Sequence, residues 1–152
     1  MMPRIVIVMP AYNAGKTIAG VFASVPKLFL KRIYEFIVVN DGSRDDTAQR
    51  LEVLKKRYKK ISVLTHPSNR GYGQAQKTGF SEALRLGADV SVVLHSDGQY
   101  PPEKLPDIVN CMIEKGADIV IGSRMLGGNV LKGGMPIHRY IGNRILTAVE
   151  NL

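Results

Sequence analysis

Residues 5–17 read IVIVMPAYNAGKT, and the rest of the chain repeats the pattern that this stretch begins. A run of Ile, Val and Met, typical of a strand covered on both faces, passes into a loop of small and polar residues. The loop ends in Gly15-Lys16-Thr17, which nearly completes the phosphate-binding pattern G-x-x-x-x-G-K-[ST]. Pro10 stands in place of the first glycine and has no backbone N–H to offer a phosphate. The stretch therefore predicts a strand followed by a loop of a different kind.

The same order, an apolar run followed by a helical pattern, recurs along the chain. Runs rich in Val and Ile predict strands at residues 4–9, 34–39, 61–65, 90–95 and 118–121. Helical periodicity predicts helices at residues 15–25, 45–59, 73–86, 103–115 and from 137 to the end. Such alternation favours an α/β fold of Rossmann type, a mostly parallel sheet with helices on both faces. No linker interrupts it, so residues 1–152 are expected to form a single domain.

The chain is basic, with 21 Lys and Arg against 13 Asp and Glu and a net charge of +8. An excess of this size indicates an anionic partner. Much of it lies in one predicted helix and the turn after it, at Arg50, Lys55, Lys56, Arg57, Lys59 and Lys60. These residues are interpreted first as a solvated helix face and second as an anionic membrane contact. Nucleic acid is disfavoured, because the aromatic residues, 7% of the chain, are not interleaved with this basic stretch.

The expected location is cytoplasmic, with peripheral attachment at the cytoplasmic membrane face as an addition. The sequence has no apolar run of about 18 residues that could span a membrane, and its start lacks the pattern of a signal peptide. Cys111 is the one cysteine, so an intrachain disulfide is excluded and a reducing compartment is expected.

Ligands of open parallel sheets bind beyond the carboxyl ends of the strands, so the loops that follow each strand were compared. They read PAYN (10–13), NDGSRDDT (40–47), HPSNRGYG (66–73), HSDGQYPPE (95–103) and GSR (122–124). Any one of them can be an ordinary capped turn between a strand and a helix. Because all of them should meet at one edge of the sheet, together they predict a polar binding site there.

Five segments resemble the successive motifs of family 2 glycosyltransferases with the GT-A fold: VMPAYNAGKTI, FIVVNDGSRDDT, NRGYGQAQKTGF, VVLHSDGQYPPE and ADIVIGSRMLGG. The likeness is to dolichyl-phosphate mannose synthases and other polyprenyl-phosphate sugar transferases, and it covers nearly the whole chain in order. It implies a GT-A nucleotide-sugar-binding domain. The implied reaction is inverting transfer of a sugar from a UDP- or GDP-sugar to an acceptor, with a polyprenyl phosphate as the expected acceptor.

The resemblance also implies which residues hold the nucleotide: Pro10, Ala11, Tyr12, Asn13, Asp41, Gly71, Ser96 and Asp97. Pro10, Ala11 and Tyr12 would lie against the base and ribose, and Asp41 would accept a hydrogen bond from the base. A flat tyrosine ring suits an aromatic base, and a carboxylate suits a ring N–H. The family often has two acidic residues where this chain has Asn40-Asp41, so the choice between uracil and guanine stays open.

The fourth of these segments carries His95-Ser96-Asp97 where the family usually has Asp-x-Asp, which positions a divalent cation. Asp97 matches the second aspartate and is expected to bind Mg²⁺ or Mn²⁺ together with nucleotide phosphates. If the segment is extended, residues 95 and 97 point to the same side, and His95 is then a second expected ligand, suited to Mn²⁺. The alternative is a histidine that hydrogen-bonds to the ribose or to a neighbouring loop.

Four residues form the expected catalytic set: Asp97, Gln99, Arg124 and Arg139. Gln99 would face the donor sugar or phosphate, and the two arginines resemble those proposed to hold phosphate groups, which the guanidinium fork suits. Residues 127–134 are rich in glycine and would form a flexible lid over the acceptor.

The sequence ends within a helical pattern, GNRILTAVENL (142–152), whereas relatives continue, so the domain is expected to be truncated at its C-terminus. Two alternatives remain open. A nucleotidyltransferase also binds nucleotides with a metal, but it typically has a glycine-rich, basic loop after the first strand. A non-catalytic nucleotide- or polyanion-binding module is the other, favoured by His95 and the short chain.

Overall fold

The computed structural model describes residues 3–123 and 136–150 of the chain. They divide into two compact units, Met1–Ala117 and Asp118–Leu152, and each is described by itself. The first unit contains a sheet with helices around it. In the second, the regular element is a helix, α6 (Ile137–Glu150). The expectation of a single domain over residues 1–152 stays a prediction.

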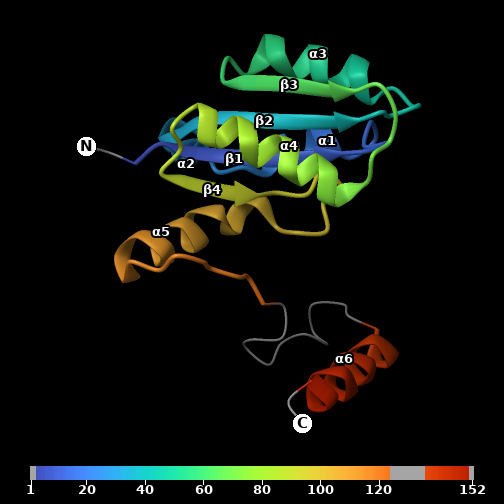
Figure 1. Cartoon of the computed structure of the whole chain (residues 1–152), viewed down its shortest axis with the longest axis vertical. Coiled ribbons are helices and arrows are strands. Elements are labelled where there is room, and N and C mark those ends of the chain that lie inside the picture. The colour runs from blue at the N-terminus through green and yellow to red at the C-terminus, as the bar shows by residue number, and fades with distance from the viewer. Residues whose placement is uncertain (1–2, 124–135, 151–152) are drawn as a thin grey trace. The chain divides into compact units, whose positions relative to one another are not determined.

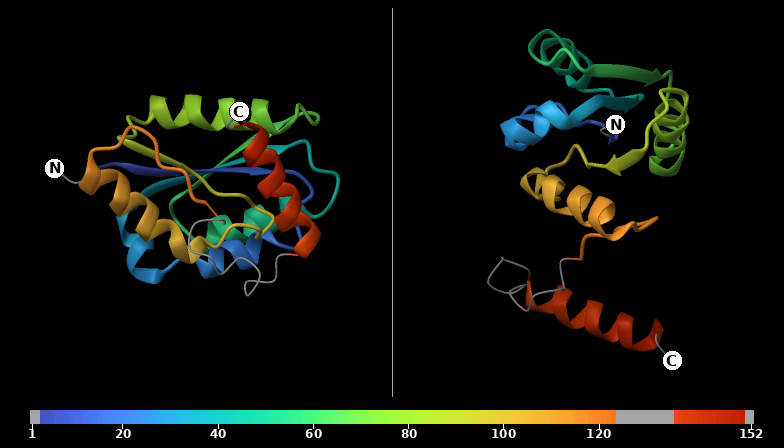
Figure 2. Two further views of the ribbon diagram at one scale, coloured as in Figure 1. Left: turned by 90° about the horizontal axis from the view of Figure 1, so that it is seen from below. Right: turned by 90° about the vertical axis from the view of Figure 1, so that its left-hand side faces the viewer.

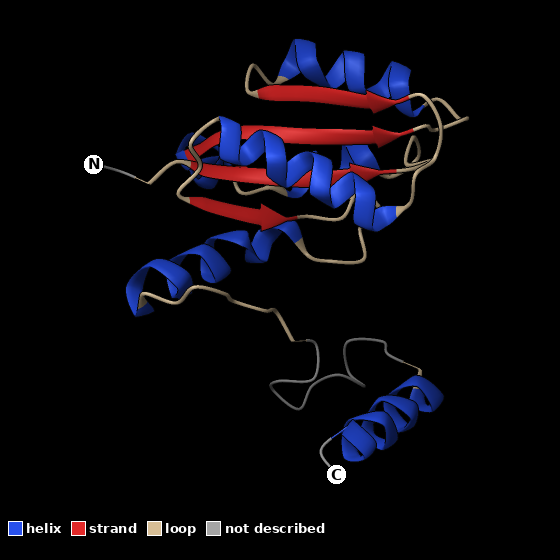
Figure 3. Cartoon of the chain, viewed as in Figure 1, coloured by secondary structure: helices blue, strands red, loops and turns tan. Residues whose placement is uncertain are grey.

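Four parallel strands form the sheet of the first unit: β1 (Ile5–Ala11), β2 (Ile33–Asp41), β3 (Ile61–His66) and β4 (Val90–Val93). Their order is β3-β2-β1-β4, and every neighbouring pair is parallel. All the arrowheads in Figure 3 therefore point to the same edge of the sheet. The chain moves outward from β1 to β3 and then crosses back to β4, so the strand order reverses between β1 and β4. A reversal of this kind is where open parallel sheets bind ligands.

Helices cover both faces of this sheet, as predicted: α1 (Ile18–Ser24), α2 (Lys27–Arg32), α3 (Thr47–Arg57), α4 (Tyr72–Arg85) and α5 (Leu105–Lys115), the last preceded by a short 3₁₀ turn, η1 (Pro102–Lys104). α4 lies on one face, and α1, α3 and α5 lie on the other (Figures 1 and 2). The side chains of β1 alternate between the two faces. Ile5, Ile7 and Met9 join the larger core cluster, whereas Val6 and Val8 pack with residues of α4.

The predicted strand at residues 118–121 is wrong. This segment has no regular secondary structure, and the side chains of Ile119 and Ile121 are 78% and 84% exposed. A strand needs a neighbour that accepts and donates its backbone hydrogen bonds. Within the described residues this segment pairs with no strand, so its apolar pattern alone does not make it one.

One strand is shorter than predicted, and one helix is additional. The strand predicted at residues 90–95 ends at Val93, although the Leu94 N–H still donates to the Val8 carbonyl at 3.0 Å. The six-residue helix α2 was not predicted. Its signals are a proline, Pro26, directly before the first turn and basic residues, Lys31 and Arg32, in the last turn.

α4 approaches β1 closely at Gly79, and this contact yields a test of the packing. A Cβ at Gly79 would lie 2.3 Å from the Cγ1 of Val8, which is fully buried. Alanine gains about 1 kcal/mol of helix propensity over glycine. Overpacking of a core typically costs about 1–3 kcal/mol. We therefore expect Gly79→Ala to lower the free energy of unfolding by about 1 kcal/mol, measured by urea denaturation.

Gly73 in the same helix provides the matched control, because a Cβ there would meet nothing within 4 Å. Gly73→Ala is expected to leave the stability unchanged or to raise it slightly. Equal effects of the two substitutions would contradict the close contact between α4 and β1.

Candidate functional site

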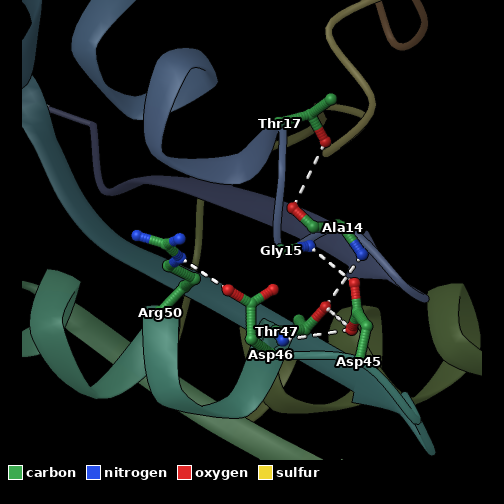
Figure 4. Close-up of polar contacts among 7 residues, drawn as sticks. All are labelled: Ala14, Gly15, Thr17, Asp45, Asp46, Thr47 and Arg50. Carbon is green, nitrogen blue, oxygen red and sulfur yellow. Dashed lines mark hydrogen bonds and ion pairs between the residues drawn. The ribbon is translucent and has the colours of Figure 1, made fainter.

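The loop after β1 (residues 12–17) is fastened to the loop after β2 and the first turn of α3. Three consecutive N–H groups donate to side chains there: Asn13 N to Ser43 Oγ (3.0 Å), Ala14 N to Thr47 Oγ1 (2.8 Å) and Gly15 N to Asp45 Oδ2 (3.0 Å). The Ala14 and Gly15 contacts are drawn in Figure 4. In a phosphate-binding loop these N–H groups would point at the phosphate. Here they are used within the protein, which agrees with the exclusion of a phosphate loop from Pro10.

Gly15 and Asp45 lie at the centre of these contacts. A Cβ at Gly15 would lie 1.8 Å from Asp46 Oδ1, so the Asp46 side chain would have to rotate away from its contact with Arg50. The hydrogen bond from the Thr47 hydroxyl, with those from the backbone N–H groups of Gly15 and Thr47, lowers the pKa of Asp45 despite the opposing effect of burial. The aspartate therefore stays ionised and accepts all of these bonds.

Asp41 ends β2 at the carboxyl edge, and its side chain is buried among donors. Oδ1 accepts from the His66 ring at 2.6 Å and from the Arg70 N–H at 2.9 Å, and Oδ2 accepts from the Gly71 N–H at 2.9 Å. Burial by itself would raise the pKa of Asp41, but these hydrogen bonds together lower it. The carboxylate is thus ionised and fixed in direction.

The loop after β4 is anchored to β1 and α1 by Ser96. Its hydroxyl donates to the Pro10 carbonyl at 2.9 Å, and its own carbonyl accepts from the Thr17 hydroxyl at 2.7 Å. Ser96 is buried. Its hydroxyl therefore holds two loops of the site together across the reversal between β1 and β4, and the nucleotide contact expected of it stays a prediction.

Asp97 and Gln99 follow in an exposed turn. Asp97 Oδ1 accepts from the Gln99 N–H at 2.9 Å. The extended geometry assumed for residues 95–97 is wrong, because Ser96 and Asp97 lie in this turn, which the positive φ of Gly98 (76°) continues. A turn no longer guarantees that the side chains of residues 95 and 97 share one side.

His95 lies between two tyrosine rings. The ring of Tyr72 is 5.1 Å away and that of Tyr100 is 4.6 Å away, and the Tyr72 hydroxyl is 2.9 Å from His95 Nε2. Gln76 donates to the same hydroxyl at 2.9 Å, so the hydroxyl is left to donate to Nε2. Burial is the largest cause of a raised pKa for Tyr72, and the charges of Tyr100 and Asp97 are smaller causes, so the hydroxyl keeps its proton. This geometry gives His95 a hydrogen-bond partner within the protein, the first residue of α4, whereas the alternative role named the ribose or a neighbouring loop. The expected role of His95 as a metal ligand stays a prediction.

The remaining expected residues are distributed as follows. Pro10 and Ala11 belong to β1 and are buried, whereas Tyr12 is 46% exposed and Asn13 is exposed with a φ of 50°. Asn13 Oδ1 accepts from the Arg44 N–H at 2.9 Å. Gly71 directly precedes α4 with a φ of 88°. The nucleotide contacts of all these residues stay predictions.

Arg124 and the lid expected at residues 127–134 lie outside the described residues. Arg139 lies in α6, in the second unit, and its side chain also falls outside the description. The phosphate-binding roles of the two arginines therefore remain expectations from the sequence.

Five side chains that hold the site together are not among the site residues expected from the sequence: Ser43, Asp45, Thr47, His66 and Thr78. All five fall inside the strand-end loops or the family-like segments quoted from the sequence. Asp, Ser and Thr after a strand equally favour capping and turn hydrogen bonds. That preference was the available signal for the first three.

Parallel strands whose order reverses between β1 and β4, with polar loops at the carboxyl edge, define an α/β domain of the nucleotide-binding kind. The profile of the family described as Glycosyl transferase family 2 matches residues 6–151. The chain belongs to this family.

Curated relatives agree with the family. The UDP-N-acetylglucosamine–dolichyl-phosphate N-acetylglucosaminyltransferase of Methanococcus voltae is 31% identical over 160 aligned positions, which cover 97% of this chain and 62% of the relative. The dolichol-phosphate mannosyltransferase of Pyrococcus furiosus is 31% identical over 138 positions, 91% of this chain and 38% of the relative. The chain thus spans less than two thirds of the length of these relatives.

Among solved structures, the mannosyltransferase PcManGT of Pyrobaculum calidifontis, in complex with GDP-Man and Mn²⁺, is similar with a TM-score of 0.60. The sequences are 21% identical, and the match covers 80% of this chain and 34% of that chain. The likeness establishes a GT-A-like fold, in agreement with the prediction from the sequence.

The hydrogen bond between Thr47 and the loop after β1 can be tested by substitution of Thr47. Thr47→Val keeps the shape of the side chain but leaves the buried Ala14 N–H without its acceptor. Because a buried donor without a partner costs about 1–3 kcal/mol, the free energy of unfolding should fall by that amount. Thr47→Ser retains the hydroxyl and should lose less. Chemical denaturation of both variants measures the difference, and equal losses would show that the hydroxyl contributes nothing.

Asp41 gives a prediction for pH. Its folded-state pKa lies below the unfolded value of 3.8, so its stabilising effect is present above pH 3.8 and is lost as the pH falls through the folded pKa. Asp41→Asn should lower the free energy of unfolding by about 2 kcal/mol at pH 7, because the amide cannot accept from all three donors. The gap between the two proteins should narrow as the pH falls below 3.8, in urea titrations from neutral to acid pH.

Asp107 of α5 serves as the control, since its surface pair with Lys104 is exposed and contributes little. Asp107→Asn should therefore follow the wild-type curve. A gap between wild type and Asp41→Asn that stays constant down to acid pH would contradict the role given to the ionised Asp41.

Proposed function

We propose that this chain is the nucleotide-sugar-binding part of an inverting glycosyltransferase that uses a UDP- or GDP-sugar and delivers the sugar to a polyprenyl phosphate. The observation that carries the proposal is the arrangement at the carboxyl edge. There, the loops after β1, β2 and β4 are tied together by Asp45, Thr47 and Ser96 on either side of the point where the strand order reverses. In an open parallel sheet this is the place for a nucleotide.

The donor assignment rests on these loops and on the relatives. Tyr12 offers a half-exposed ring at one side of the reversal, and Asp97 an exposed carboxylate at the other. Such a pair suits a base at one end and a diphosphate at the other. A relative named for a UDP-sugar and a similar structure solved with GDP-Man support a nucleotide-sugar donor without choosing between the bases.

The described residues offer one carboxylate, that of Asp97, as a ligand for a divalent cation at this edge. None of the described residues belongs to a group of three or more His, Cys, Asp or Glu side chains that could hold a metal ion. Mg²⁺, however, is commonly held by one or two carboxylates and the substrate phosphates. Asp97 can supply such a carboxylate, and the Mn²⁺ in the PcManGT complex supports the same type of site. When bound, the cation would neutralise charge on the leaving diphosphate.

The proposed reaction joins an acceptor oxygen to the anomeric carbon of the sugar, and the nucleoside diphosphate leaves. A phosphate acceptor is already ionised, so it needs no strong general base, and none is assigned in this chain. The relatives named for dolichyl phosphate support such an acceptor. Gln99, Arg124 and Arg139 remain the proposed contacts to sugar and phosphate. The guanidinium groups of the two arginines suit phosphate oxygens.

Attachment to an anionic membrane surface at the cytoplasmic face is part of the proposal. The side chains of Lys55, Lys56, Arg57, Lys59 and Lys60 are exposed at the end of α3 and after it. Basic residues of this kind are attracted to anionic lipids. In the described part of the chain, no helix has the length and apolar character needed to cross a bilayer.

Nucleotide binding is the first test. UDP- and GDP-sugars are added separately with Mn²⁺ or Mg²⁺, and the thermal unfolding of the chain is recorded. Either the UDP-sugars or the GDP-sugars should raise the midpoint temperature of unfolding, because a ligand at 100 times its Kd stabilises the folded state by about 2.7 kcal/mol.

Asp97→Ala should abolish the part of this shift that depends on the metal, whereas Asp107→Ala, at an exposed position of α5, should retain it. If no nucleotide sugar stabilises the chain, the proposed function is wrong. If Asp97→Ala keeps the full metal-dependent shift, Asp97 is not the ligand.

A further inference from the structure

His66, the last residue of β3, is a buried histidine that the proposed function does not use. It is 7% exposed, and both of its ring nitrogens have partners. Nδ1 lies 2.6 Å from Asp41 Oδ1, and Nε2 lies 3.0 Å from the hydroxyl of Thr78 in α4. The three side chains form a continuous chain of hydrogen bonds from the middle of α4 to the end of β2.

The partners fix which nitrogen carries the proton. An ionised carboxylate only accepts hydrogen bonds, so the nitrogen that faces Asp41 must donate. In the neutral imidazole Nε2 is then the acceptor, and the Thr78 hydroxyl donates to it. Asp41 thus selects the tautomer whose N–H points at the carboxylate, and the hydrogen bond from Thr78 holds the ring in that orientation.

The hydrogen bonds of Asp41 distinguish its two oxygens. Oδ1 accepts from the His66 ring and from the Arg70 N–H, which fills its two acceptor positions. Oδ2 accepts from the Gly71 N–H and from no other group in the described part of the chain, so one acceptor position is left on that oxygen. The side chain of Asp41 is 4% exposed. Oδ2 is the oxygen at which a ligand could add a hydrogen bond, and that ligand must bring a donor.

Gly42 keeps this arrangement compact. Its φ of 65° is favourable for glycine, and a Cβ there would lie 2.4 Å from the backbone carbon of Ser68. The segment between β3 and α4 therefore lies directly against the residue after Asp41. This contact brings the Arg70 and Gly71 N–H groups within reach of the carboxylate.

We infer that His66, oriented by Thr78, is a positioning residue that turns Asp41 so that Oδ2 selects nucleotide bases with an imino N–H. The inference rests on the proposed function and on the expectation from the sequence that Asp41 accepts a hydrogen bond from the base. Uracil and guanine carry a ring N–H that can donate to Oδ2. Cytosine presents an unprotonated ring nitrogen at the corresponding position, which would face the carboxylate with a lone pair. His66 acts on the base and not on the phosphates or the metal.

The experiment measures the Kd of the 152-residue chain for UDP, GDP, CDP and inorganic pyrophosphate in the presence of Mn²⁺, by calorimetry. Wild type is compared with His66→Leu, which cannot donate, and with His66→Asn, whose amide N–H can replace Nδ1–H. Ser62→Ala is the matched control. It removes another hydrogen bond between β2 and β3, the one from Ser62 Oγ to Glu35 Oε1 at 2.7 Å, and leaves the carboxyl edge intact.

The expected result is a loss of selectivity. In His66→Leu the preference for UDP or GDP over CDP should fall by about tenfold, because Asp41 loses a charge-assisted hydrogen bond that fixes it. Affinity for CDP and pyrophosphate should change little. His66→Asn should recover most of the preference, and Ser62→Ala should match wild type.

Other outcomes overturn the inference. An equal loss of affinity for all four ligands in His66→Leu, or no change in selectivity, would show that His66 has a structural role only. If His66→Leu does not fold, Thr78→Val, which leaves the imidazole in place, must still reduce the preference severalfold. Failure of wild type to bind any nucleoside diphosphate would instead remove the proposed function, which separates the two conclusions.

Discussion

Burial of β1 on both faces and along both edges is the constraint on which the first unit depends. Every residue of the strand is buried, and its backbone pairs with β2 on one side and β4 on the other. A strand in this position can carry only apolar side chains, so its polar residues begin where it leaves the sheet, at Tyr12. The same burial places the reversal of strand order beside the end of β1. The fold alone therefore places the candidate site at the carboxyl end of β1, whichever polar residues follow it.

The polar loops at that edge divide into residues that build the site and residues that face outward. Ser43, Asp45, Thr47 and Ser96 are occupied by backbone groups of neighbouring loops. Tyr12, Asp97 and Gln99 are exposed. Three polar side chains of the segment NDGSRDDT are thus structural, because they accept hydrogen bonds from the N–H groups of the loop after β1. The inward residues make the outward ones rigid, which a binding site requires.

The sequence was sufficient for the fold because the relevant signals are local. The apolar runs around Ile7, Ile37 and Val63 marked β1, β2 and β3 correctly, and the alternation with helices gave the parallel sheet. The run at residues 118–121 misled, because whether an apolar segment is a strand depends on a distant neighbour. The partners of His66 and His95 were out of reach for the same reason. Thr78 and Tyr72 belong to α4, and no spacing in the sequence indicates which helix residue meets which loop.

α4 has a mechanical consequence for the site. It is the helix that covers its face of the sheet, and its beginning serves both halves of the carboxyl edge (Figure 1). The Gly71 N–H meets Asp41, and the hydroxyl of the next residue, Tyr72, meets His95. The contact of Gly79 with Val8 sets how deeply the helix lies on the sheet. Because Gly79 has no Cβ, α4 can lie close to β1, and this depth determines where the start of the helix meets Asp41 and His95. We therefore expect substitutions that change the packing of Gly79 on Val8 to displace the loops at the carboxyl edge before they unfold the domain.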